Sequence, residues 1–147
     1  MVLMNDARLP PARPDDDSES ASLRARLRSH LLARLPKAGD HVSALPGLTL
    51  YRRDGTTEPA SMLYEPSVGF VVQGRKRVVL GSDVHEYDPA RFVLTAVDLP
   101  TISQVLEADP GRPCLSMMLK LDFALVQAIG GEMTCKASQR RATPNPA

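Results

Sequence analysis

The fold of this 147-residue chain is decided by residues 67–87, which read SVGFVVQGRKRVVLGSDVHEY. The first seven of these residues are nearly all apolar, which is typical of a strand that is buried on both faces. Gly74 interrupts the run, six more residues with strand character follow, and Gly81-Ser82-Asp83 has the composition of a turn. The stretch ends with four residues of a further short strand. It therefore predicts a series of short strands joined by tight turns.

The six residues that follow the glycine alternate in character. Arg75 and Arg77 share one face of the expected strand, and Lys76, Val78 and Leu80 share the other. Three consecutive basic residues could contact phosphate, but no aromatic residue is interleaved with them to stack on a base. Lysine and arginine also protect exposed strand edges from pairing. We therefore expect this basic cluster to be the solvated rim of a hairpin.

The same β character extends from residue 48 to about residue 122, after a turn-rich connector over residues 37–47. Turn signals recur roughly every 8–12 residues, which is the pattern of a mainly β sandwich or barrel. The expected strands are Leu48–Arg53, Ser61–Tyr64, Ser67–Gln73, Arg75–Leu80, Val84–Tyr87, Arg91–Val97, Ile102–Ala108 and Cys114–Leu121.

One helix is expected on each side of the β region. Leucines recur every fourth residue from position 23 to position 35, with arginines around them. This spacing predicts an amphipathic N-terminal helix over residues 22–35 that ends at Pro36. On the other side, Asp122 can cap a short C-terminal helix over residues 123–129, which Gly130-Gly131 ends.

The composition is that of one soluble domain. We expect this domain over residues 21–130, between a disordered arm over residues 1–20 and a polar tail over residues 131–147. The net charge of +1 gives no electrostatic case for binding nucleic acid or a membrane. There is no signal-peptide core, and Cys114 and Cys135 have no metal-type spacing. The sequence therefore predicts a cytoplasmic protein with reduced thiols.

Signatures of catalysis are scarce. The three histidines, His30, His41 and His85, fall in no spacing that aims two imidazoles at one ion, so we expect no metal. Phosphate-binding glycine loops and a nucleophile elbow are absent from the sequence as well. Cys114 lies in an apolar strand and is interpreted as a small core residue. The sequence therefore predicts no cofactor and no enzyme activity.

A cavity inside the β structure is the remaining candidate site. Small closed or two-sheet β structures can enclose one ligand between apolar walls and a few polar groups. Tyr64 and Gln104 are the expected polar contacts, with Phe70 and Val72 as apolar wall. The alternative is that the same four side chains fill the interior as core. An interior volume of roughly 300 Å³ or more would favour ligand binding.

Several segments, taken in order, resemble the N-terminal domain of AraC-type transcription regulators. The ordered resemblance extends from about Leu27 to about Ala128. Its most distinctive part is Tyr64-Glu65-Pro66-Ser67 followed by residues 71–78. The other matching segments are Gly39-Asp40-His41, Leu45-Pro46-Gly47-Leu48, Tyr51-Arg52-Arg53, Tyr87-Asp88-Pro89 and Val97-Asp98-Leu99-Pro100.

The resemblance implies a cupin-like double-stranded β-helix, which is a jelly-roll barrel. It also implies a domain that senses a small-molecule effector, supports a homodimer and signals to a C-terminal pair of helix-turn-helix motifs. In this chain Gly130-Gly131 and a polar sequence stand where longer helices would follow. We therefore expect the DNA-binding domain to be absent from this chain, and the chain alone to have no specific affinity for DNA.

Two rival functions stay open. The first is a small metal-free cupin enzyme of the isomerase or epimerase type, which would need an acid and a base facing the cavity with shifted pKa values. The second is a pure dimerisation module whose barrel is filled with side chains. An open interior favours the sensor, and a packed interior favours the module.

Overall fold

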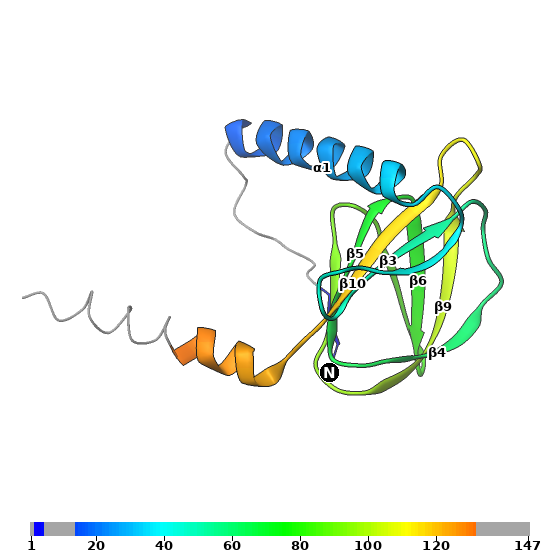
Figure 1. Cartoon of the computed structure of the whole chain (residues 1–147). Helices are drawn as coiled ribbons and strands as arrows, with labels where there is room; N and C mark the ends of the chain where they lie inside the picture. Colours follow the sequence, from blue (N-terminus) through cyan, green and yellow to red (C-terminus); the bar gives the residue numbers. More distant parts are fainter. Residues whose placement is uncertain (1, 5–13, 132–147) are drawn as a thin grey trace, which may run out of the picture.

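The computed structural model describes residues 2–4 and 14–131 of the chain (Figure 1). The described residues form ten strands, one long helix and a helical segment over residues 123–131. In chain order the elements are β1 (Val2–Met4), α1 (Pro14–Arg34), β2 (Gly39–Val42), β3 (Leu48–Arg53), β4 (Ala60–Tyr64), β5 (Ser67–Gln73), β6 (Arg75–Leu80), β7 (Asp83–Tyr87), β8 (Phe92–Thr95), β9 (Leu99–Glu107) and β10 (Cys114–Lys120).

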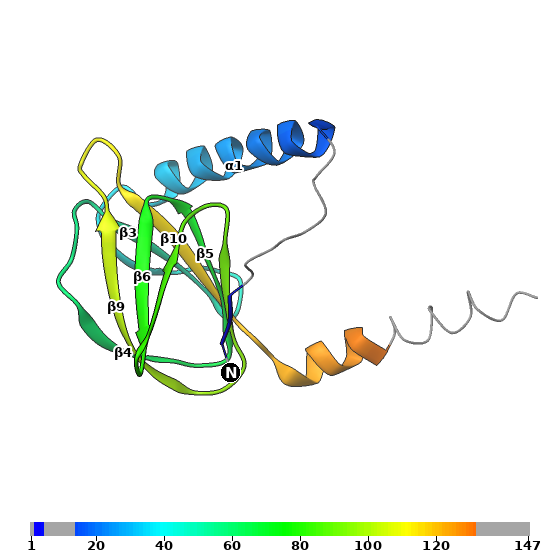
Figure 2. The same cartoon turned by 180° about the vertical axis from the view of Figure 1, so that it is seen from behind.

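The strands form two sheets that face each other (Figures 1 and 2). One sheet has the order β4-β9-β6-β7, and the other has the order β1-β8-β5-β10-β3-β2. All neighbouring strands are antiparallel. From β3 onward the chain changes sheet after every strand except β6. This winding is that of an eight-stranded jelly roll, with β1 and β2 added at the edges of one sheet. The cupin-like fold is thereby confirmed.

The main core lies between the two sheets. It contains Tyr64, Val71, Val78, Tyr87 and Val93, which come from five different strands. Successive side chains of a strand point to opposite faces, so one residue in two of each strand lines this interior. Strand β6 follows this rule, since Val78 is buried inside the barrel and Val79 faces outward.

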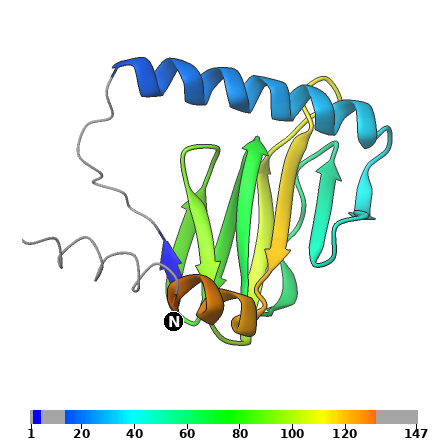
Figure 3. The ribbon, with the colours of Figure 1, turned by 60° about the vertical axis from the view of Figure 1, so that its left-hand side comes forward.

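A second apolar cluster joins helix α1 to the outer face of the larger sheet. Leu31 and Leu35 pack there against Leu50, Val72 and Leu115. Only the end of the leucine repeat is buried in this way. Leu31 is 4% exposed, whereas Leu23, two turns earlier, is 53% exposed. The first half of α1 accordingly extends past the edge of the barrel (Figure 3).

Helix α1 begins at Pro14, earlier than the residue 22 that the leucine spacing predicts. Residues 14–20 are therefore helical and do not belong to a disordered arm. Pro14 suits the first helical position because its missing N–H has no partner there anyway. Asp17, in the first turn, places negative charge near the positive end of the helix dipole. The rest of the expected arm and residues 132–147 of the expected tail lie outside the described residues.

Two strands were not expected. Strand β2 lies within the segment interpreted as a turn-rich connector, and it pairs with β3 from Gly39 to Val42. Strand β1 pairs with β8 at the opposite edge. Both are short edge strands, of three and four residues, and such short segments carry too little alternation to predict a strand. The eight expected strands are all present, and their ends differ from the expected ends by three residues or fewer.

Candidate functional site

A partly open cavity of about 140 Å³ lies inside the barrel, between the two sheets. Its walls come from both sheets, because inward-facing residues of β3 and β10 oppose those of β4, β6 and β9. Exposed Glu58 and Ala60, at the start of β4, mark its mouth. The lining residues are Tyr51, Arg53, Thr57, Glu58, Ala60, Met62, Tyr64, Lys76, Ser103, Val105, Ser116 and Met118.

Two cationic side chains lie over one aromatic ring in this cavity. The Lys76 ammonium is 5.7 Å from the centroid of the Tyr51 ring, and the Arg53 guanidinium carbon is 5.9 Å from it. Both distances are within the range of a cation–π contact. Arg53 also donates to an Asp40 carboxylate oxygen at 2.5 Å. Within the described part of the chain, Lys76 makes no ion pair.

Hydroxyl groups from both sheets also line the cavity. The Tyr64 hydroxyl donates to Ser103 Oγ at 3.4 Å, and both side chains are buried. Thr57 Oγ1 accepts a hydrogen bond of 2.9 Å from the Val105 N–H. Ser116 is only 5% exposed, and its hydroxyl makes no hydrogen bond to another described residue. The cavity therefore combines cations, hydroxyl donors and the apolar side chains of methionine and valine.

The phenols of Tyr51, in the cavity wall, and of Tyr87, in the core, stay protonated at neutral pH. Burial raises the pKa of Tyr51, and the negative charge of Asp40 raises it further. Burial also raises the pKa of Tyr87, well above its ordinary value, and the adjacent Tyr64 phenol adds to this effect. A protonated phenol donates a hydrogen bond and is a poor general base. These groups are accordingly suited to hold a ligand rather than to remove a proton from it.

The structure does not bring the four predicted site residues together. Tyr64 lines the cavity as expected. Phe70 and Val72 point to the outer face of β5, where they line a groove of about 360 Å³ beneath α1. Gln104 pairs with Arg77 across β9 and β6 and faces away from the interior, because inward and outward residues alternate and Ser103 is the inward one. A single cavity lined by all four residues is therefore wrong.

Sequence reasoning missed the cationic part of the site. The cluster at residues 75–77 was interpreted as a solvated rim, and this interpretation is wrong for Lys76. Arg75 and Arg77 do face outward, where they pair with Glu86. Lys76 lies on the same face as Val78, which is buried in the core. The alternation of the strand carried this signal, since it placed Lys76 on the apolar face.

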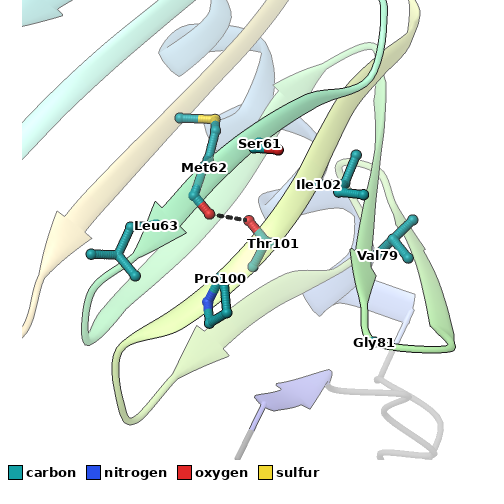
Figure 4. A pocket seen from close by; sticks show the side chains of 8 residues that line it. All are labelled: Ser61, Met62, Leu63, Val79, Gly81, Pro100, Thr101 and Ile102. Atoms are coloured by element: carbon teal, nitrogen blue, oxygen red, sulfur yellow. Dashed lines mark hydrogen bonds between the residues drawn. The ribbon is translucent and has the colours of Figure 1, made fainter.

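A larger hollow of about 470 Å³ lies on the outer face of the smaller sheet (Figure 4). Leu63, Pro100, Ile102 and Val79 line it, and the Thr101 hydroxyl donates to the Met62 carbonyl nearby at 3.1 Å. This hollow is open to solvent, and few polar groups converge on it. Ligand sites bury most of the ligand and hold it with a few polar groups. The cavity inside the barrel is the better candidate for this reason.

Two further findings concern metals and membranes. Among the described residues, no three histidine, cysteine, aspartate or glutamate side chains are grouped as they would be around a metal ion. No helix in residues 14–131 has the length and apolar character needed to span a bilayer.

Comparison with known proteins gives one family. No curated protein matches the chain. Among solved structures, that of the Clostridium difficile EutQ protein is similar, with 10% sequence identity and a TM-score of 0.34 over 58% of this chain and 63% of that one. The chain spans less than two thirds of that protein. The fold assignment rests on the strand order of the two sheets and not on this similarity.

A family model described as the AraC-type transcriptional regulator N-terminus matches residues 44–147. Since the match covers more than half of the chain and every strand from β3 to β10, this protein belongs to that family, which indicates a regulatory role in sensing or dimerisation.

Proposed function

We propose that this protein is the effector-sensing domain of a cytoplasmic transcription regulator, and that a small molecule binds reversibly in the cavity inside the barrel. The observation that carries the proposal is the cavity between the two sheets, with Tyr64, Lys76 and Ser116 in its walls. DNA contact is made outside the described residues. The described helices, α1 and residues 123–131, are separated by the whole barrel and cannot form a helix-turn-helix.

The cavity is suited to a signal because its walls come from both sheets. A ligand that contacts β3 and β10 on one side and β6 and β9 on the other adds bonds between the two sheets. The outer faces of β3 and β10 carry the residues that hold α1, among them Leu50 and Leu115. A shift of these strands on ligand binding would therefore move the residues against which α1 packs.

The size of the cavity limits the effector. At about 140 Å³ the cavity does not reach the roughly 300 Å³ that was expected of a ligand-binding interior, and it is too small for a drug-sized ligand. A pure dimerisation module would have an interior filled with side chains, whereas this barrel keeps an open space. The effector should thus be a compact molecule, with room for about five water-sized groups.

An enzyme is the less suitable alternative. Acid–base catalysis needs a base whose pKa lies near the working pH. Glu58 is the one carboxylate among the lining residues, and it is exposed at the mouth. The raised pKa of Tyr51 keeps that phenol protonated. These groups favour binding without turnover.

A thermal-shift screen of small metabolites against the full chain tests this proposal. A ligand held only by the folded state stabilises it by about 2.7 kcal/mol at a hundredfold excess over Kd, which should raise the melting temperature by roughly 5 °C or more. Tyr64→Phe and Ser116→Val should reduce the shift, since both change the cavity wall. Gln104→Ala is the matched control, because Gln104 faces outward. A screen without hits, or hits that ignore both cavity variants, would contradict the proposal.

Dimerisation is a second candidate role, favoured by a specific surface. The outer face of the smaller sheet exposes Leu63, Val84 and Ile102. We propose that this face contributes to a homodimer. Light scattering of the full chain and of Ile102→Glu tests it: the wild-type chain should be a dimer and the variant a monomer. A monomeric wild-type chain would contradict this role and leave the sensing role intact.

A further inference from the structure

Lys76, one of the two cations that line the cavity, contacts the Tyr51 ring but lacks the carboxylate partner that every other cation on the described strands has. Strand arginines and lysines of the described residues otherwise form ion pairs with carboxylates: Arg52 with Asp54, Arg53 with Asp40, Arg75 with Glu86 and Glu107, Arg77 with Glu86, and Lys120 with Glu65. Lys76 is half-buried and forms none. A partly desolvated charge without a counter-charge is costly, and an anionic ligand would supply that counter-charge.

A second unpartnered group lies in the same cavity. Ser116 is only 5% exposed, and its hydroxyl, which keeps some accessible surface, makes no hydrogen bond to another described residue. Buried hydroxyls are normally hydrogen-bonded, to protein, water or ligand. Ser116 and Lys76 come from opposite sheets and line one cavity. Two donors that make no hydrogen bond or ion pair with another described residue therefore line the same space.

The rest of the wall is consistent with an anion that also has an apolar part. Arg53 adds a second positive charge over the Tyr51 ring, although Asp40 already neutralises part of it. Met62, Val105 and Met118 supply apolar surface. The carboxylate of Glu58 also lines the cavity, but it lies at the mouth, where water screens its charge.

We infer that the cavity binds a short-chain carboxylate, whose anionic head accepts hydrogen bonds from Lys76 and Ser116 and whose short chain contacts the apolar wall. This inference rests on the proposed function and names the chemical class of its effector. The volume of about 140 Å³ limits the ligand to roughly five or six non-hydrogen atoms. An inorganic oxyanion would satisfy the donors and leave the apolar wall uncovered, so the carboxylate is the better fit.

Calorimetric titration of the full chain with matched probes tests the inference. The probes are propionate and butyrate, their neutral isosteres propionamide and butyramide, and inorganic phosphate and sulfate. The carboxylates should bind and the amides should not. Lys76→Met should weaken carboxylate binding at least about tenfold, because a hydrogen bond to a charged group is lost. Lys37→Met is the matched control, since Lys37 is exposed, and it should leave Kd unchanged.

Each other outcome overturns the inference in a distinguishable way. Equal affinity for butyrate and butyramide, an unchanged Kd in Lys76→Met, or binding of phosphate or sulfate without carboxylate contradicts the assignment of ligand class. If neutral metabolites from the thermal-shift screen bind and the carboxylates do not, the inference fails and the proposed function stands. If no compound of either kind binds, both fail. Should Lys76→Met not fold, Lys76→Gln and Ser116→Ala provide the same test.

Discussion

Arg52 Nη1 donates a hydrogen bond of 2.7 Å to the carbonyl oxygen of Leu35. Leu35 directly follows helix α1, where the last carbonyls have no partner within the helix. The same guanidinium donates through Nε to Asp54 at 2.7 Å, so its orientation is fixed from the other side. Leu35 itself is almost fully buried beneath the helix. One arginine of β3 therefore caps the helix and attaches it to the sheet.

Arg52→Met should lower the free energy of unfolding by about 1–3 kcal/mol, because it leaves the Leu35 carbonyl without its donor. Urea denaturation of the full chain measures this change. Arg34→Met is the matched control, since Arg34 is exposed at the end of the same helix, and it should change stability by about 0.5 kcal/mol or less. Equal effects of the two substitutions would contradict the capping role of Arg52.

Gly74→Ala should destabilise the barrel severely. Gly74 has a φ of 92°, and a Cβ built there would lie 2.5 Å from the Glu107 carbonyl oxygen and 3.0 Å from Cys114 Cβ. The left-handed conformation alone costs an alanine about 1–2 kcal/mol, and the contact with backbone adds to this cost.

Gly81→Ala separates these two causes. Gly81 has a φ of 59°, but a Cβ there would meet nothing within 4 Å. Its substitution should therefore cost only the conformational part, about 1–2 kcal/mol. Melting temperatures of the two variants should differ clearly, with the Gly74 variant lower. Similar melting temperatures for the two variants would show that the backbone moves the Glu107 carbonyl oxygen away from the new Cβ at little cost in stability.

The strands could be predicted from sequence because each one carries its own local signal. The apolar run before Gly74 indicates a strand that is buried on both faces, and the alternation after Gly74 indicates a strand that is buried on one face. Both patterns can be recognised without knowing which distant residues the strand contacts. Strand β2 could not be predicted in this way. It is held by pairing with β3, from Asp40 opposite Tyr51 to Val42 opposite Thr49, and its own residues are half-exposed. Pairing of that kind is a tertiary contact.

The site was harder to predict than the fold. Tyr64 could be placed in the interior from its strand, but Gln104 was placed on the wrong face. The inward residues of β9 are the odd-numbered ones, Thr101, Ser103 and Val105, and Ile102 is exposed on the outer face beside Gln104. Two of the three inward residues are polar and the outward set includes an isoleucine, so hydrophobic alternation does not reveal which face is buried. The pairing with β4 and β6 decides it, and that pairing is a tertiary contact.

Glu86 should contribute stability that is lost in acid. Hydrogen bonds from Arg77, at 3.1 and 2.6 Å, hold the pKa of Glu86 below its ordinary value, and the charges of Arg77 and Arg75 add to this effect. A carboxyl whose pKa is lowered by folding stabilises the fold above its unfolded pKa, and this contribution disappears as pH falls through the folded value. The pH window is thus below about 4.3, the ordinary value for glutamate.

Glu86→Gln should be less stable than the wild-type chain at neutral pH, and the difference should shrink as the pH falls below about 4. Urea midpoints measured from neutral to acid pH give this profile. Glu19→Gln serves as control, because Glu19 is exposed on α1 and forms no ion pair with any other described residue. A stability difference that stays constant across the pH range would contradict the role of the Glu86 carboxylate.

The Cys114 thiol should be unreactive in the folded chain. It is 2% exposed, and burial raises its pKa, while the positive charges of Lys76 and Arg53 oppose that rise. Only the thiolate reacts with iodoacetamide, so a raised pKa and a closed surface both slow the reaction. Labelling of the folded chain at neutral pH should leave Cys114 unmodified, and labelling in urea should modify it fully. Because Cys135 lies outside the described residues, the extent of modification is read from the Cys114 peptide by mass spectrometry. Labelling of Cys114 in the folded chain at the rate found in urea would show that this part of the barrel opens readily, contrary to the packing seen around Gly74.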